Sequence, residues 1–371
     1  MPNEELMQDK PKIGTVGGEA LMEGIMMRGP EGKAAISLRL PDGSIETTLK
    51  KINLPSDRCK ILGWPLIRGP VNLVSSMAFG MKCMMESTEK VTEGIMEEAA
   101  AEGEKMSKLD KWIDAHFGPK MMTVITVIGA VLGIGLAVVM FSMLPRLTYD
   151  GIAWLVARFA GEGVNLDAFQ AVIEGVVRIS LFVLYMFCMS LLKDIRRVFQ
   201  YHGAEHKAIY CYEAGLELTV ENVRAQSRLH PRCGTSFLFV VLLLSIAVGV
   251  TLSSTPVVSD WWRHDNLAIS TGMRLLMLPL IMALGYEFIR FAGKHLDNPI
   301  MRALSFPGVS MQRITTKEPD DKVIEVGIVA LKAALGMPYE EETNDYEPRD
   351  FAPPDFTPPS DADSPTETVA E

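Results

Sequence analysis

The longest apolar runs of the chain lie in its middle part and form four segments: Met121–Leu144, Ala168–Leu192, Ser236–Val257 and Thr271–Ala292. Each segment has at least the roughly 20 residues that an α-helix needs to cross a bilayer. The sequence therefore predicts an all-α polytopic membrane protein with about four transmembrane helices in residues 121–292.

The N-terminal region, residues 1–56, has no such run and contains strand-like segments instead. Lys33–Leu40 and Ser44–Ile52 flank the turn residues Pro41-Asp42-Gly43, and an Asp-Gly pair between two such segments is typical of a β-hairpin. We therefore expect a small cytoplasmic unit with a β-hairpin. The glycine-rich segment Gly17–Pro30 ahead of it is interpreted as a tight backbone turn.

Residues 57–120 combine an apolar part and a charged part. Ile61–Met85 is apolar but contains Pro65 and Gly69, which favours an interfacial or re-entrant helix over a complete span. Glu86–Lys111 carries charge on all faces and is interpreted as a solvated helix or a linker.

Residues 293–337 are expected to form a cytoplasmic helical segment behind the last span. Asp320–Leu335 has apolar residues at helical spacing and ends at Gly336, a common helix terminator. Residues 338–371 are acidic and rich in proline, so we expect a disordered tail.

The distribution of basic residues sets the expected orientation. The connector of residues 193–235 holds seven of them: Lys193, Arg196, Arg197, Lys207, Arg224, Arg228 and Arg232. The connector after the first span holds only Arg146 and Arg158, and the one after the third span holds only Arg263. Because basic connectors stay in the cytoplasm, a multi-pass inner-membrane protein with both termini in the cytoplasm is expected.

Charge and cysteine content exclude two classes of protein. A net charge of -10 argues against nucleic acid as a partner, since binding to phosphates demands a basic surface. Five cysteines without framework spacing argue against a disulfide-stapled secreted module. The first sixty residues lack the apolar core of a cleavable signal peptide. The expected partners are the lipid bilayer and other membrane proteins.

The polar chemistry of the chain is concentrated in the basic connector. His202 and His206 are spaced i, i+4 with Glu205 between them, so all three project from one face of a helix continuing from the second span. His-x-x-Glu-His is the inverted zinc-hydrolase pattern, in which two imidazoles bind the metal and the carboxylate is the general base. His230 and Cys233 are the candidates for further ligands.

Three interpretations of this cluster remain open. Four filled ligand positions indicate a structural zinc site, whereas three ligands leave a position for water and make Glu205 the general base. Histidines at a membrane interface also often only bind backbone or lipid headgroups. Gly203, inside the predicted helix at a cost of about 1 kcal/mol relative to alanine, indicates a close approach to the backbone, by a ligand or by packing.

Charged residues inside the predicted spans form a second candidate site. Glu174 and Arg178 lie one turn apart and are expected to neutralise each other. The alternative is a polar path or a lipid-headgroup site within the bundle. Glu287 and Arg290 are expected to snorkel at the cytoplasmic end of the last span, with Tyr286 and Glu287 facing the histidines as the alternative.

The segment Gly17–Pro30 is the third candidate. It is not a nucleotide-binding loop, because no Gly-Lys-Ser/Thr sequence follows its glycines. Besides a turn, the alternative is that Glu19, Glu23 or Arg28 lies next to the histidines as an extra ligand or a substrate contact.

Three stretches resemble the bacterial YqhQ-like membrane proteins, a family of unknown function whose members are often labelled metal-dependent enzymes. They are Gly17–Pro30, Tyr201–Lys207, and Val220–Arg224 together with His230–Ser236. The resemblance covers about residues 12–335 and implies a multi-pass helical protein with cytoplasmic parts. It implies no particular substrate.

Two functions follow as hypotheses. The first is a divalent-metal site, zinc first, at the cytoplasmic face, with His202, His206, His230 and Cys233 as ligands and Glu205 as base. It would belong to a hydrolase of a lipid or a membrane-proximal peptide. The second is a non-catalytic membrane scaffold, transporter-like component or biogenesis factor with structural histidines.

Overall fold

The N-terminal unit is a four-stranded antiparallel sheet. The computed structural model describes residues 16–52, 55, 59–101, 119–160, 166, 169–255, 261, 266–295 and 298–339. Consecutive strands pair in the order β1-β2-β3-β4, and their bounds are Gly17–Leu21 for β1, Gly24–Arg28 for β2, Lys33–Arg39 for β3 and Ile45–Lys51 for β4. The predicted hairpin of β3 and β4 is confirmed.

The interpretation of Gly17–Pro30 as only a tight turn is wrong, because this segment is itself a hairpin. β1 and β2 pair antiparallel and reverse at Met22 and Glu23, where Glu23 has a φ of 49°. Strand β2 is buried on both faces, so it lacks the alternation of polar and apolar residues that marks a half-exposed strand. A short 3₁₀ turn at Pro30–Gly32 connects it to β3.

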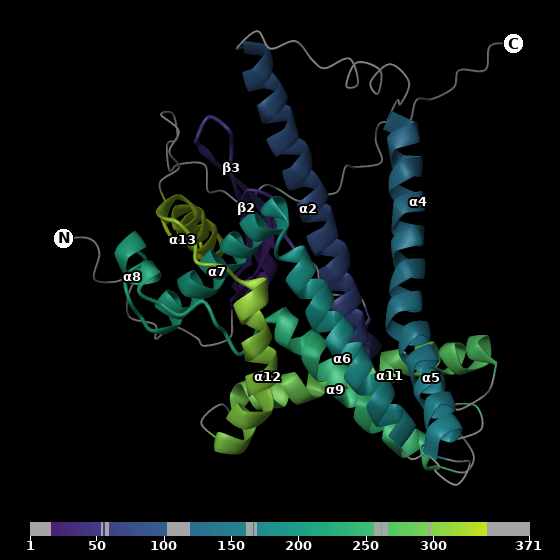
Figure 1. Cartoon of the computed structure of the whole chain (residues 1–371). Helices are drawn as coiled ribbons and strands as arrows, with labels where there is room; N and C mark the ends of the chain where they lie inside the picture. The colour runs from purple at the N-terminus through teal and green to yellow at the C-terminus, as the bar shows by residue number, and fades with distance from the viewer. Residues whose placement is uncertain are drawn as a thin grey trace, which may run out of the picture.

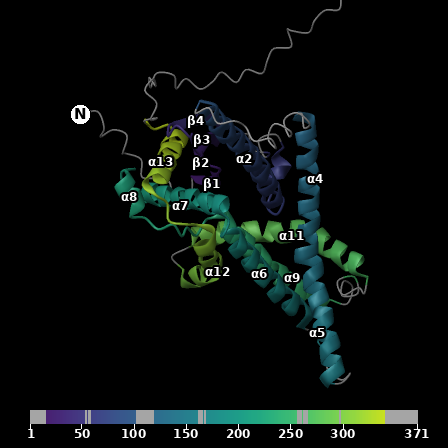
Figure 2. The same ribbon diagram turned by 45° about the horizontal axis from the view of Figure 1, so that its top comes forward.

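Helices cover both faces of the sheet (Figures 1 and 2). Helices α7 (Lys193–Glu213) and α13 (Asp321–Leu335) pack on one face, where Ile25 and Met27 join their core. Helix α2 (Arg68–Ala101) packs on the other face, where Met26 and Ile36 contact a core that includes Cys83. Strands near the N-terminus and a helix near residue 335 therefore form one folded unit.

Helix α13 confirms the predicted C-terminal helix. The Asp320 side chain accepts a hydrogen bond from the Val323 backbone N–H and caps the first turn. Gly336 ends the helix in the left-handed conformation at φ 71°. Its buried residues fill the core beneath the sheet, so the helix is integral to the same folded unit as the sheet. The expected disordered tail, residues 338–371, lies almost wholly outside the described residues.

Three helical stretches of the described chain are long and apolar enough to cross a membrane: Ile128–Ala160, Gln170–Met189 and Leu267–Ala292. The first consists of α4 (Pro119–Val138), the π-helical turn η4 (Val139–Met143) and α5 (Leu144–Ala160), which form one continuous helix. The others are α6 (Gln170–Met189) and α11 (Leu267–Lys294).

Two boundaries of the predicted spans are corrected. The first helix extends to Ala160, so Arg146 and Arg158 lie within it and not in a connector. The third predicted span corresponds to α9 (Gly234–Ser253), whose apolar stretch Ser236–Leu252 is shorter than a full span. The structure thus shows three candidate spans where the sequence predicts four.

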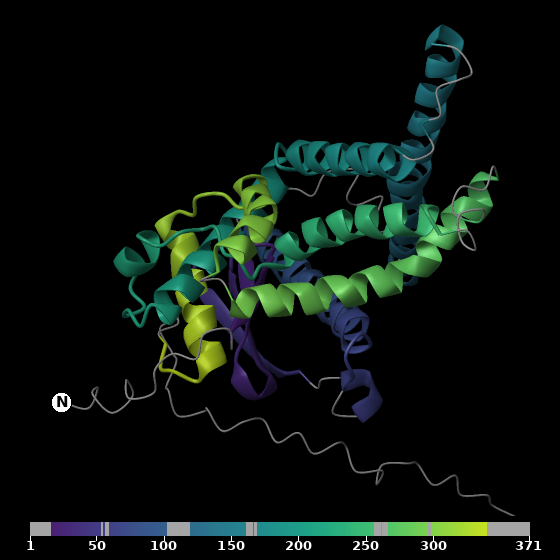
Figure 3. The same ribbon diagram turned by 90° about the horizontal axis from the view of Figure 1, so that it is seen from below.

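Helices α6, α9 and α11 run side by side, and α12 (Pro299–Thr315) packs on the end of α9 (Figure 3). At that contact a Cβ on Gly308 would lie 3.0 Å from the Cβ of Ser236. This helix, which the sequence did not resolve as an element of its own, connects the bundle to the folded unit of the sheet, α7 and α13.

Residues 57–120 are not divided into an apolar helix and a charged linker at Glu86 as predicted, because helix α2 includes residues of both parts. The short 3₁₀ helix η3 (Lys60–Gly63) precedes it, and α2 then continues unbroken through Glu86 to Ala101. One side packs on the sheet, while Val74, Met77 and Met81 on the opposite side are exposed. Residues 102–118, which include the rest of the predicted linker, lie outside the described residues.

The charged residues of the spans have other partners than expected. Glu174 pairs with Arg274 of α11 at 3.0 Å and not with Arg178. Glu287 accepts two hydrogen bonds from Arg68 of α2, at 2.6 and 2.7 Å, and the Tyr286 hydroxyl accepts one from Asn72. The alternative that Tyr286 and Glu287 face the histidines is therefore wrong.

Candidate metal centre

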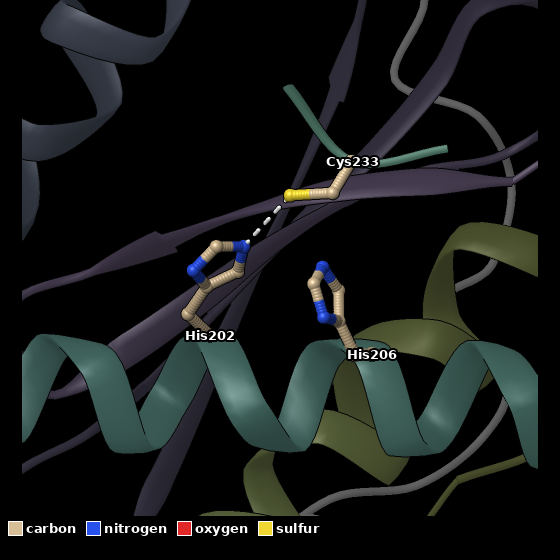
Figure 4. Close-up of side chains that lie close together, drawn as sticks. All are labelled: His202, His206 and Cys233. Carbon is tan, nitrogen blue, oxygen red and sulfur yellow. Dashed lines mark hydrogen bonds between the residues drawn. The ribbon is translucent and has the colours of Figure 1, made fainter. Parts of the chain in front are cut away.

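Helix α7 holds the predicted metal-binding motif. Three residues, Ser190 to Leu192, separate it from α6, so it begins a new helix and does not continue the span as predicted. His202 and His206 project from the same side of α7 (Figure 4), as their i, i+4 spacing predicts. Glu205 and His206 are buried, and His202 is partly exposed.

Cys233 approaches the two histidines from the connector that precedes α9 (Figure 4). One ligand atom from each of His202, His206 and Cys233 lies within 4.8 Å of the others. The distance from His202 Nε2 to Cys233 Sγ is 3.2 Å. The structure therefore brings together three of the four ligands that the sequence predicts.

Backbone carbonyls orient both imidazoles. His202 Nδ1 lies 2.9 Å from the carbonyl oxygen of Thr315, and His206 Nδ1 lies 2.6 Å from that of Arg228. Because a carbonyl only accepts, each Nδ1 must carry the proton, which leaves the Nε2 lone pair of a neutral ring free to bind a metal. Metal-binding histidines commonly have such outer hydrogen bonds.

The connector that carries Cys233 is fixed to α12. The buried amide of Gln312 accepts from the His230 backbone N–H at 2.7 Å and donates to its carbonyl at 2.7 Å. Arg228 donates to both the carbonyl and the hydroxyl oxygen of Thr316, at 2.6 and 2.7 Å. These bonds hold the Arg228 carbonyl against His206, so the site depends on α12 as well as on α7.

Gly203 lies where the chain passes closest to α7. A Cβ at this position would lie 2.1 Å from the carbonyl oxygen of Lys317, and the Lys317 backbone N–H donates to the Phe199 carbonyl at 2.8 Å. The close approach that the glycine indicates is therefore packing against the segment between α12 and α13. The Thr315 carbonyl next to His202 belongs to the last residue of α12, directly before this segment.

Glu205 lies beside the three candidate ligands, His202, His206 and Cys233, and against strand β1. Its carboxylate oxygen is 3.9 Å from His202 Nε2, and it accepts a hydrogen bond from the Gly18 backbone N–H. Burial raises its pKa to about 7, although the neighbouring His202 and the Gly18 hydrogen bond act in the opposite direction. A carboxyl group with a pKa near neutrality is suited to accept and release a proton.

His230 lies next to this group but is not part of it. Its ring centroid is 5.6 Å from that of His206, and its Nε2 is 3.6 Å from a carboxylate oxygen of Glu213. Its Nδ1 accepts from the Arg232 backbone N–H at 3.3 Å. Burial lowers the pKa of His230, so the ring packs as a neutral side chain behind His206.

Of the charged residues in the segment Gly17–Pro30, the third candidate of the sequence, only Glu19 is a neighbour of the site among the described contacts. Gly18 of β1 leaves room for Glu205, since a Cβ there would lie 2.8 Å from Glu205 Cγ. Glu19 is close enough to interact electrostatically with both His202 and Glu205, and burial raises its pKa. Glu23 instead binds Arg197 and the Tyr201 hydroxyl.

The remaining member of that segment, Arg28, lies away from the histidines. Its Nη1 donates to the Ser76 hydroxyl of α2 at 2.8 Å. The sequence reasoning did not find Thr315 and Arg228, because a backbone carbonyl carries no sequence signal. The glycines at positions 17 and 18 are the sequence signal that another element can approach β1 closely, as Glu205 does at Gly18.

The donor set fits zinc. Two imidazole nitrogens and one thiolate are ligands that zinc prefers, at about 2.0–2.3 Å from the ion. Tetrahedral geometry at such lengths requires about 3.3–3.6 Å between ligand atoms, and the 3.2 Å between His202 Nε2 and Cys233 Sγ is close to this range. The residues present therefore fit a three-ligand site with one position left open.

Comparisons with known proteins agree with the resemblance but name no activity. YqhQ of Bacillus subtilis (strain 168), described as an uncharacterized protein, is 31% identical over 330 residues, which make up 88% of this chain and 94% of the Bacillus protein. No solved structure matches the chain. The label of metal-dependent enzyme has no support from these matches. The model of the family DUF1385, a protein of unknown function, matches residues 64–337, and the chain therefore belongs to the DUF1385 family.

Proposed function

We propose that this protein is an inner-membrane metal-dependent hydrolase whose centre holds a divalent ion, zinc first, on His202, His206 and Cys233. The observation that carries this proposal is the convergence of three ligand atoms within 4.8 Å, from a helix and a connector 27 residues apart in sequence. Both imidazoles have their Nδ1 bound to a carbonyl, which prepares Nε2 for the ion.

Glu205 is the general base of this proposal. A bound zinc ion supplies Lewis acidity, which polarises an ester, amide or phosphoryl oxygen and activates water. The Glu205 carboxylate, 3.9 Å from His202 Nε2, accepts the proton of the attacking water and passes it to the leaving group. The substrate class is a lipid or a membrane-proximal peptide, and the support for this is that only Ser190 to Leu192 separate α7 from the candidate span α6.

We further propose that the chain crosses the membrane four times with both termini in the cytoplasm. The sheet, α7 and α13 pack on one another, so a membrane cannot separate them. The helices between the sheet and α7, and those between α7 and α13, must then cross an even number of times. Helices α4–α5 with α6, and α9 with α11, satisfy this condition.

Metal analysis of the purified protein tests the ion site. The wild type is expected to hold about one equivalent of zinc, and His206→Ala and Cys233→Ser are expected to lose at least tenfold in affinity. His230→Ala is the matched control, because it removes a buried imidazole outside the group of three, and it is expected to keep the metal. Equal, near-zero metal in the wild type and both ligand variants would contradict the proposal.

Substitution of zinc by cobalt distinguishes whether Glu205 is the general base or a fourth metal ligand. A thiolate-to-cobalt charge-transfer band should appear in the wild type and vanish in Cys233→Ser. Glu205→Gln is expected to leave the cobalt spectrum unchanged and to abolish hydrolysis of ester and amide lipids and peptides in proteoliposomes. A changed spectrum would make Glu205 a ligand and favour the alternative, a structural site in a non-catalytic scaffold.

A further inference from the structure

A second cluster of charged side chains lies inside the helical bundle, at the far end of α6 from the metal centre. Glu174 on α6 and Arg274 on α11 form a buried ion pair at 3.0 Å, and Gln170 donates to the same carboxylate at 2.8 Å. Arg146 on α5 is also buried and binds Asp150, one turn further along, at 3.0 Å. We call these five residues, with Arg178 and Thr271, the outer cluster.

The outer cluster carries one positive charge in excess among the described residues. Its three arginines, Arg146, Arg178 and Arg274, face two carboxylates, Asp150 and Glu174. Arg178 is bound by neutral acceptors, the Phe141 carbonyl at 2.8 Å and the Ser245 hydroxyl at 3.3 Å. An unbalanced charge inside a membrane span is unfavourable, which favours an anion as an additional component.

Two donors of the cluster are buried and have no hydrogen-bond partner among the described residues. They are Nη1 of Arg146 and Oγ1 of Thr271. Arg146 lies near enough to Arg274 to interact with it electrostatically, and Thr271 is one helical turn from Arg274. A buried donor without a partner is unfavourable, so these atoms are suited to hydrogen-bond an acceptor that the described residues do not supply.

The residues of the cluster on α6 and α11 lie toward one end of these helices. Gln170 is the first residue of α6, and Arg274 lies in the second turn of α11, which begins at Leu267. At 1.5 Å per residue, Glu174 and Arg274 lie about 6 and 10 Å from those ends. Because a span of 20 residues is about as long as the hydrocarbon core is thick, the end of α6 lies near the lipid phosphates, which are the anions nearest to the cluster.

We propose that the outer cluster is a binding site for a phosphate group, with Arg146 and Thr271 as the donors that contact it. Guanidinium groups match the geometry of phosphate oxygens, and the excess charge selects a net anionic ligand. The phosphate comes either from the headgroup of an anionic phospholipid or from free phosphate. The site is independent of the proposed metal centre, which lies beyond the other end of α6, about 30 Å along the helix axis.

Thermal unfolding of the full chain in a neutral detergent tests this site. Increasing phosphatidylglycerol is expected to raise the unfolding midpoint until it saturates, and phosphatidylcholine is expected to raise it less. Arg146→Gln should raise the half-saturating concentration of phosphatidylglycerol at least tenfold. Saturation by inorganic phosphate, with no added effect of the lipid, would support the site and assign it to free phosphate.

Arg158→Gln is the matched control, because it removes an exposed arginine of the same helix α5 that lies outside the outer cluster, and it is expected to respond within twofold of the wild type. If Arg146→Gln does not fold, Arg146→Lys keeps the charge and loses the forked donors, so a three- to tenfold weaker response is expected. Equal responses to both lipids, or a wild-type response of a folded Arg146 variant, would overturn the proposal.

Discussion

At the scale of single residues, small side chains determine where the candidate metal centre is assembled. Gly203 admits the Lys317 carbonyl to α7, and Gly18 admits the Glu205 side chain to β1. In both cases a Cβ would lie closer than 3.0 Å to a heavy atom of the neighbouring element. The two glycines therefore determine how closely α7 approaches the segment between α12 and α13 and strand β1. This distance sets the positions of His202 and Glu205 relative to Thr315 and the sheet.

Gly203→Ala tests this constraint. Alanine would favour an isolated helix by about 1 kcal/mol, but its Cβ would lie 2.1 Å from a backbone oxygen that cannot rotate away. We expect a lower unfolding midpoint and a loss of about 1–3 kcal/mol, as in other overpacked cores. Gly272→Ala on α11, where nothing lies within 4 Å of the added Cβ, is the control and should not lower the midpoint. A stabilised Gly203→Ala variant would show that the α12–α13 segment yields easily.

At the scale of elements, local signals predict an element well, and contacts between distant elements are not predictable from them. The Asp-Gly turn correctly predicts the β3–β4 hairpin, and Asp320 with Gly336 correctly predicts the limits of α13. Strand β2 carries no such signal, because both of its faces are buried. The partner of Glu174 was predicted at i+4, yet Arg274 lies 100 residues away in sequence.

The difference between local signals and distant contacts also explains which of the predicted ligands the structure brings together at the candidate metal centre. The i, i+4 spacing fixes His202 and His206 on one face of α7, and this follows from helix geometry alone. The choice between His230 and Cys233 depends on how the connector turns, which Gln312 of α12 decides by binding both backbone groups of His230. A pattern of residue types cannot distinguish the two.

The N-cap of α13 offers a test at this scale. The Asp320 side chain accepts from the Val323 N–H at 2.9 Å and also binds Arg197 of α7 at 3.0 Å. Asp320→Ala removes both interactions and is expected to destabilise the folded unit of the sheet, α7 and α13 by about 1–2 kcal/mol. Asp320→Asn keeps the cap and should retain most of the stability, because an ion pair that is half exposed contributes little. Equal losses in thermal unfolding would mean that the ion pair with Arg197 dominates.

At the scale of the whole molecule, the folded unit of the sheet, α7 and α13 constrains the membrane topology more strongly than hydropathy does. Helix α9 has only a 17-residue apolar stretch, about 26 Å at helical rise, which is a few ångströms less than the hydrocarbon thickness. Because α13 packs on α7, α9 must nevertheless cross if α11 does. The π-helical turn at Val139–Met143 and the continuous α5 remove Arg146 and Arg158 from the first connector, which sharpens the contrast with the basic connector of residues 193–235.

Labelling of single cysteines by a membrane-impermeant maleimide in spheroplasts tests this topology. In a background without the five native cysteines, Glu221→Cys on α8 (Val220–Arg224) and Met337→Cys behind α13 should react only after permeabilisation. Ala160→Cys at the end of α5 should react in intact spheroplasts. Basic residues remain on the cytoplasmic side during insertion, and the two inner positions belong to one packed unit, so they must behave alike. Labelling of Met337→Cys but not of Glu221→Cys in intact spheroplasts would mean that α9 does not cross, and the packing of α13 on α7 could not then exist in the membrane.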